Sequence, residues 1–222
     1  MSDVLTARRL SAALLVAFIA FTTNAGAALL VPGAGLPTPP EAPDGLGAFV
    51  AGGVPVGFVG PGVNGYSGTL TATVIQEPPG QNPLGGLTFT YQLHNNATSK
   101  TALERINVID FSGFATDVSF LPATGVAPSV TDRSFGAGAV IGWDFIGVPS
   151  GLGTLMPGQT SALMVVQTNA PQYDLTQSAS IIDGAIASVP SIGPSINLIT
   201  PEPMSLSYLA VGAAAFVRRR VK

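Results

Sequence analysis

Short stretches in which polar and apolar residues alternate dominate the middle of this chain. In residues 87–94 the odd positions hold Leu, Phe, Tyr and Leu, and the even positions hold Thr, Thr, Gln and His. Residues 69–74 alternate Thr with apolar residues in the same way. Because successive side chains of a strand point to opposite faces, both segments predict strands with one buried and one wet face.

Further strands are predicted where apolar segments stand between turn residues. Residues 161–168 form a more continuous apolar run directly after the turn signal Pro157-Gly158, as is typical of a central strand covered on both faces. Asp183-Gly184 predicts a two-residue hairpin turn between two short strands. The remaining strand candidates are 103–111, 117–121, 139–145, 179–182 and 185–189.

The number and spacing of these segments predict an all-β fold. About seven short strands with turns between them and no long helical period suit an antiparallel β-sandwich, immunoglobulin-like in the loose sense. A jelly roll or an open barrel is the alternative architecture. We expect the sandwich domain to occupy residues 67–189.

Segments rich in Gly and Pro flank this expected domain. Residues 28–66 predict loop and linker, with an extended, polyproline-type piece at 36–40. Short strands are expected there only at Phe49-Val50 and at residues 54–59. Residues 190–199 contain further prolines and predict a second linker.

The first 27 residues have the three parts of a secretory signal peptide. Arg8-Arg9 forms a basic start, residues 10–21 form an apolar helical core, and Ala25 and Ala27 supply the small-x-small cleavage site. The mature chain would then begin at the next residue, after export by the translocon and cleavage by signal peptidase. An uncleaved anchor is the alternative, and the residues around Arg8-Arg9 match the twin-arginine motif poorly, which favours the general secretory route.

Residues 200–222 contain three distinctive parts in a fixed order. A triplet of two prolines around an acid comes first, an uncharged apolar run at 206–217 follows, and a basic cluster closes the segment. The prolines keep the triplet extended and separate from the helix expected after it, and the basic cluster favours the cytoplasmic side of a membrane. The triplet is Pro201, Glu202 and Pro203, and the cluster is Arg218, Arg219 and Arg220.

This tail resembles the PEP-CTERM sorting signal of bacterial surface proteins. The resemblance covers about a tenth of the chain and implies recognition of the triplet by an exosortase-type transpeptidase, with the arginines retaining the protein in the membrane beforehand. It also implies a cell-surface or matrix location associated with exopolysaccharide. A plain C-terminal anchor is the alternative, although residues 204–217 would span only about 21 Å as a helix, against a hydrocarbon core of about 30 Å.

The charge distribution limits which partners and which location are possible for this protein. Six of the nine basic residues lie in the two terminal segments, and residues 28–200 keep three basic residues against ten acidic ones. So few cations cannot neutralise many phosphates, which excludes nucleic acid as a partner. The two basic flanks also predict that both ends start on the cytoplasmic side and that the middle is exported. With no cysteine, thiol nucleophiles, thiolate metal sites and disulfides are excluded.

Between the two terminal segments, the sequence contains few residues in patterns typical of catalysis or metal binding. His94 is the only histidine and is expected at a solvated strand end, and no nucleophile elbow, phosphate loop or zinc motif is present. We therefore predict no enzymatic activity, no catalytic residue, no metal and no cofactor. Asp132 and Asp144 are the pair of acids that could meet as calcium ligands from separate loops, and Trp143 is expected in the core rather than on a sugar-binding face.

Three functions are compatible with this sequence. The first is a non-enzymatic surface or matrix protein delivered by its tail. The second is a carbohydrate- or ligand-binding module presented at the surface, and the third is a small secreted hydrolase, which would need two facing carboxylates. The triplet Asn96-Ala97-Thr98 matches a glycosylation acceptor but is interpreted as a polar turn.

Overall fold

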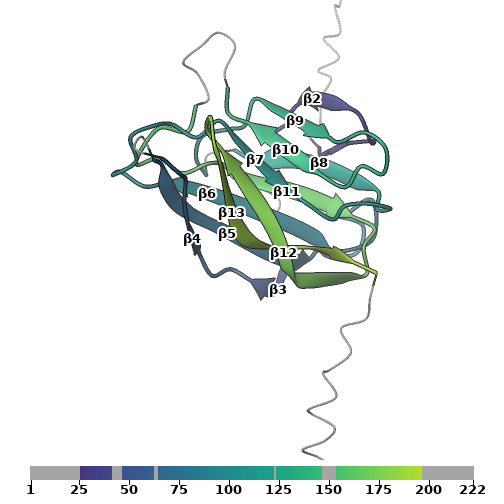
Figure 1. The fold of residues 1–222 in the computed structure, drawn as a ribbon. Coiled ribbons are helices and arrows are strands. Elements are labelled where there is room, and N and C mark those ends of the chain that lie inside the picture. The colour runs from purple at the N-terminus through teal and green to yellow at the C-terminus, as the bar shows by residue number, and fades with distance from the viewer. Residues whose placement is uncertain (1–25, 42–46, 63–64, 123, 147–153, 197–222) are drawn as a thin grey trace, which may run out of the picture.

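The computed structural model describes residues 26–41, 47–62, 65–122, 124–146 and 154–196. These residues form thirteen strands in two sheets, and every pairing between the strands is antiparallel (Figure 1). No helix occurs among the described residues. The all-β prediction is therefore confirmed for this part of the chain, and the expected signal helix and membrane helix lie outside it.

The first sheet has seven strands. In spatial order they are β1 (Ala28–Leu29), β8 (Thr116–Leu121), β11 (Leu163–Thr168), β6 (Thr88–Asn95), β5 (Ser67–Gln76) and β3 (Ala48–Gly52), with β4 (Val56–Val59) also paired to β5.

The second sheet has six strands. In spatial order they are β13 (Ile186–Ser195), β12 (Gln172–Ile182), β7 (Arg105–Val108), β10 (Ile141–Asp144), β9 (Val130–Arg133) and β2 (Gly35–Pro37).

The two sheets share one core, as in a β-sandwich. Tyr91 of β6 and Trp143 of β10 are fully buried, and their ring centroids lie 5.8 Å apart across the interior. The Tyr91 hydroxyl donates a 2.7 Å hydrogen bond to the backbone oxygen of Ile192 in β13. Aromatic pairs and buried apolar area of this kind are the main stabilising contribution of such an interior. The prediction that Trp143 lies in the core is confirmed.

Most of the predicted strands are present, with shifted ends. Residues 69–74 lie in β5, 87–94 correspond to β6, and 117–121 and 161–168 correspond to β8 and β11. The candidates at 103–111 and 139–145 are shorter in the structure, as β7 and β10.

The expected domain limits are too narrow at both ends. Residues 28–66 were predicted to be mainly loop and linker, yet they contain β1 to β4, which complete both sheets. The predicted linker at 190–199 is wrong up to Ser195, because β13 continues through Pro190 and Pro194. Proline is tolerated there because β13 is an edge strand, where a missing N–H group breaks no ladder hydrogen bond.

The hairpin between β12 and β13 also differs from its prediction. Ile182 pairs with Ile186, so the loop contains three residues rather than the predicted two. The Asp183 N–H group bonds to the Ala185 oxygen at 3.1 Å, and Gly184 adopts a φ of +63°, which glycine reaches at little cost. This three-residue geometry is a common hairpin solution with one residue in the left-handed region.

Candidate functional site

The residues predicted for processing and sorting lie almost entirely outside the described ranges. Ala27 is the exception: it is half-buried and stands directly before the first residue of β1. At the other end, Ile196 follows β13 and is 78% exposed. The last described residue before the tail therefore lies at the surface of the sandwich. The predicted residues outside the described ranges are Ala25, Pro201, Glu202, Pro203, Arg218, Arg219 and Arg220.

The two acids considered as calcium ligands do meet, but around a cation of the protein itself. Arg105 donates to both oxygens of Asp132, at 2.7 and 2.6 Å, and to Asp144 Oδ1 at 2.8 Å. The bond to Asp132, the largest contribution, raises the pKa of Arg105 above its ordinary value. Because Arg105 already occupies the space between these carboxylates, they form a structural ion-pair network on the second sheet.

The remaining single-residue candidates have structural roles. His94 lies at the end of β6, and its Nδ1 is 3.0 Å from the Thr160 hydroxyl. Asn96 bonds to Ser67 Oγ at 3.0 Å, and the Ser99 N–H group bonds to the Asn96 oxygen, which agrees with the polar turn predicted there. Within the described ranges, no three His, Asp or Glu side chains come together in a way that holds a metal ion.

The sequence analysis did not identify Glu77, a buried acid that directly follows β5 of the first sheet. Glu77 is only 6% exposed and accepts hydrogen bonds from Thr88 Oγ1 at 2.5 Å and from Gln167 Nε2 at 2.9 Å. Thr88 was expected on the wet face of its strand, but it is fully buried by this network. Glu77 forms no ion pair with any described residue, so the network satisfies a buried carboxylate by neutral donors alone.

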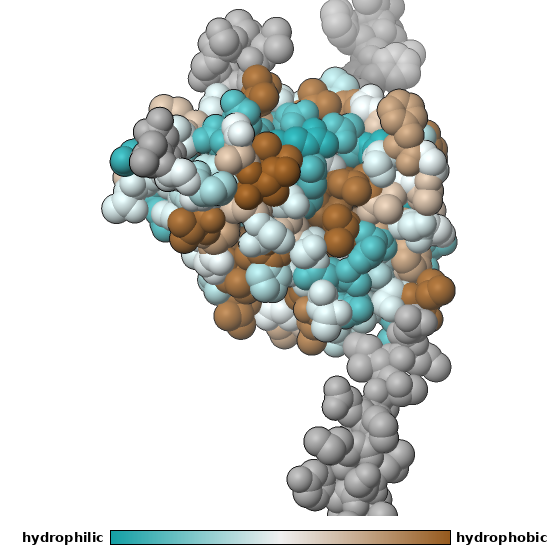
Figure 2. Space-filling model, in the orientation of Figure 1, coloured by the Kyte–Doolittle hydropathy of each residue, from teal (hydrophilic) through white to brown (hydrophobic). Residues whose placement is uncertain are grey.

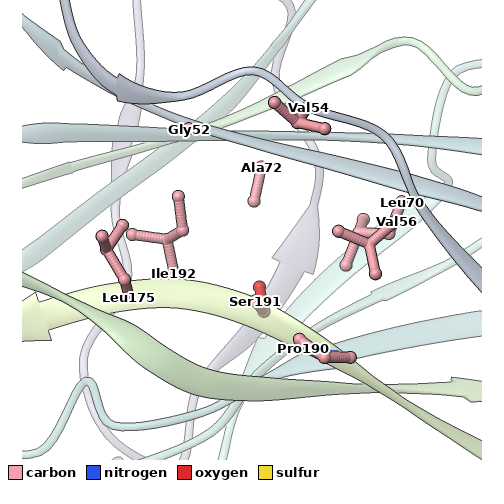
Figure 3. A pocket seen from close by; sticks show the side chains of 9 residues that line it. All are labelled: Gly52, Val54, Val56, Leu70, Ala72, Leu175, Pro190, Ser191 and Ile192. Atoms are coloured by element: carbon pink, nitrogen blue, oxygen red, sulfur yellow. The ribbon is translucent and has the colours of Figure 1, made fainter.

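A groove lies where the edges of the two sheets face each other. On one side stand Gly52, Val54, Val56, Leu70 and Ala72, from the β3–β5 part of the first sheet. On the other stand Leu175, Pro190, Ser191 and Ile192, from β12 and β13 (Figure 3). Its volume is about 170 Å³. Every lining side chain is aliphatic or small, and none is ionisable, so the groove suits an uncharged apolar group.

Strand irregularities and small residues keep this groove open. The register between β12 and β13 shifts between Asp174 and Gln177, which places Leu175 at the rim. Gly52 has a φ of +85°, and a Cβ there would overlap the Ala72 oxygen and the Ile192 side chain. Bulges and glycines at sheet edges commonly shape sites in this way.

Ser191 is the polar exception in the groove. It is 4% exposed, and its hydroxyl has no hydrogen-bond partner. Figure 3 shows the hydroxyl pointing into the space between the two sets of lining side chains. A buried hydroxyl without a partner costs about 1–3 kcal/mol, so a group that supplies one would be bound preferentially.

The rim of the groove adds exposed apolar surface. Val54 is 72% exposed, and Leu175 is also exposed. Elsewhere on the face seen in Figure 2, apolar side chains form several separate groups among polar ones. The groove therefore combines exposed apolar surface, depth and an unpaired polar atom at one place.

Sequence reasoning missed this groove because its residues come from four separate stretches of the sequence. The only local signal was Gly52-Gly53, which interrupts the expected short strands. Pro190 predicts a linker, so the strand β13 was not expected at this position. Pairing of the distant strands was needed to see that these residues face each other.

Neither a protein-family model, a curated protein nor a solved structure matches this chain. Among the described residues, no helix combines the length and apolar character needed to cross a membrane.

Proposed function

We propose that this chain is an exported bacterial surface or extracellular-matrix protein without enzymatic activity. The observation that carries the proposal is the ordered tail of Pro-Glu-Pro triplet, apolar run and arginine cluster in residues 200–222. The body is a β-sandwich, immunoglobulin-like in the loose sense, flanked by an N-terminal signal helix and a short C-terminal membrane helix. Its setting is the exopolysaccharide-associated matrix.

The delivery route follows from the two terminal segments. The translocon exports the chain and signal peptidase cuts after Ala27, directly before β1. The short apolar run and Arg218, Arg219 and Arg220 then hold the protein in the membrane while an exosortase-type transpeptidase acts near Pro201, Glu202 and Pro203. The membrane is thus at least a transient partner.

The geometry of the body supports this route. Ile196 is exposed at the end of β13, and Pro201 follows five residues later. Five residues span at most about 18 Å. Only a short length of chain thus separates the exposed end of β13 from the triplet that the enzyme would recognise.

Replacement of Glu202 tests the sorting proposal. Glu202→Ala removes the only charge of the triplet, and we expect a longer species to accumulate in the membrane fraction. Ser205→Ala, in the same tail but outside the triplet, is the matched control and should be processed normally. Intact masses of the envelope and medium fractions give the cleavage points, and normal processing of Glu202→Ala would overturn the proposal.

A second candidate function is presentation of a ligand site at the surface. The groove between the sheet edges favours it, because it combines apolar lining with an unpaired buried hydroxyl. An aliphatic lining lacks the aromatic platform that sugars stack on, so the groove favours an apolar ligand over a carbohydrate.

A further inference from the structure

We infer that the groove binds a small, neutral, mainly aliphatic molecule that carries a single hydrogen-bonding oxygen, which pairs with the Ser191 hydroxyl. This inference rests on the second candidate function, and it names the ligand class of that site. It is independent of the sorting route.

The size of the groove limits the ligand. Its volume of about 170 Å³ is close to that of cavities, about 150 Å³, which hold one benzene molecule. A ring or short chain of roughly seven non-hydrogen atoms is therefore the largest group that seats completely. A longer molecule would place its remainder over the exposed rim at Val54 and Leu175.

The chemistry of the lining limits the ligand further. No lining residue is ionisable, so a charged group would lose its hydration without gaining a counter-ion. The apolar walls contribute affinity in proportion to the area they cover. Both considerations select an uncharged aliphatic body.

Ser191 supplies the specificity. Its hydroxyl both donates and accepts, and it has no partner among the protein atoms. Figure 3 shows it at the inner side of the groove, beneath Ala72 and beside Ile192. This oxygen is covered from bulk water, so a lining side chain must move before a ligand oxygen reaches it. A ligand oxygen that does so gains a hydrogen bond to Ser191, and this bond should be lost when the hydroxyl is removed.

Two probes of equal size test this inference directly. Cyclohexanol and methylcyclohexane each have seven non-hydrogen atoms, and only the first carries an oxygen. Saturation-transfer NMR on the purified full-length protein should show that Ser191→Ala weakens binding of cyclohexanol by roughly two- to tenfold, as expected for loss of one hydrogen bond. Methylcyclohexane, which has no oxygen, should bind both proteins equally.

A variant whose side chain fills the groove tests whether the two probes bind there. Ala72→Leu extends a side chain from β5 into the groove and should abolish binding of both probes. Thr71→Leu introduces the same side chain at the next residue of β5, on the opposite face of the sheet, and should leave binding unchanged. An unfolding curve for each variant establishes that it is folded.

The possible failures are distinct. Cyclohexanol binding that is unaffected by Ser191→Ala would overturn the inference and leave the groove as a site for apolar molecules. No binding of either probe to the wild-type protein would overturn both the inference and the second candidate function. Neither result bears on processing of the tail.

Discussion

The two sheets are joined in different ways at the two lateral edges of the sandwich. At one edge, β1 and β8 of the first sheet face β9 and β2 of the second; here Arg133 of β9 crosses the gap, and we call this the Arg133 edge. At the other, β3 to β5 face β12 and β13, and the groove remains; we call this the groove edge. Both edges border the same core.

At the Arg133 edge, one buried side chain of the second sheet donates hydrogen bonds to the first sheet and to neighbouring loops. Arg133 is 4% exposed and donates to five oxygens at 2.7–3.1 Å. Burial lowers the pKa of this guanidinium below its ordinary value. The acceptors are the backbone oxygens of Leu30, Phe111, Phe114 and Gly138, and the hydroxyl of Thr116.

At the groove edge, two tyrosines donate hydrogen bonds from the first sheet to the second. Tyr66 contacts the backbone oxygens of Ile181 and Ala185 at 2.8 Å, and Tyr91 contacts that of Ile192. The residues that line the groove there include Ala72 and Ser191, whose side chains are short. The comparison indicates that a long, fully bonded side chain joins two sheet edges, whereas short side chains leave a groove between them.

Removal of Arg133 should have the largest effect on stability. Arg133→Met leaves several buried oxygens without a donor and should lower the free energy of unfolding by at least about 3 kcal/mol. Arg105→Met makes the same change in the half-exposed network of Asp132 and Asp144 and should cost about 1 kcal/mol or less. Urea unfolding of both variants checks this, and equal losses would contradict the special role of Arg133 at its edge.

Loss of the Tyr66 hydroxyl should weaken the groove edge moderately. Tyr66→Phe removes the contact to Ile181 and Ala185 and should cost about 1 kcal/mol. Tyr173→Phe, whose hydroxyl makes no described hydrogen bond, is the control and should change little. Thermal unfolding compares the two variants, and an unchanged midpoint for Tyr66→Phe would show that this tie is not needed.

Ser191→Ala should act in the opposite direction. It removes a buried hydroxyl without a partner, so we expect a gain of about 0.5–1 kcal/mol in the free energy of unfolding. A stability gain together with weaker binding of cyclohexanol is a signature of a site kept for binding. A clear loss of stability would instead show that the hydroxyl has a structural partner.

The smallest expected effect depends on pH. Asp117 of β8 lies at the Arg133 edge, and burial raises the pKa of its carboxyl above the ordinary 3.8, although a backbone bond from Val118 opposes this. The folded state therefore binds the proton more tightly, and stability falls as pH rises from about 3.8 through the raised value. Asp117→Asn should reduce this fall, measured by urea unfolding from pH 3 to 7, and an unchanged pH profile would contradict it.

Alternation predicted the central strands because both sheets bury one face there. The pattern in residues 87–94 placed β6 correctly, and Trp143 was assigned correctly to the core. Thr88 and Thr90 were expected to be wet but are buried. Local alternation identifies the face that points away from the core, but it does not reveal that a distant acid such as Glu77 will cover that face.

Proline and glycine misled the prediction at the sheet edges. The composition of residues 36–40 predicts a stiff linker, yet β2 pairs with β9, and Pro40 bridges to Phe120 of the other sheet. Pro190 predicts the end of the domain, although it lies within β13. Edge strands need fewer hydrogen bonds, so residues that break central strands are acceptable there, and the groove they border had no sequence pattern of its own.

Methyl NMR on the full-length protein, titrated with cyclohexanol, tests the difference between the two edges most directly. The account predicts shifts for methyl groups of the groove edge, at Val56, Leu70 and Ile192, and unchanged signals for Leu30 and Val118 at the Arg133 edge. Shifts at the Arg133 edge, or none at the groove edge, would contradict it.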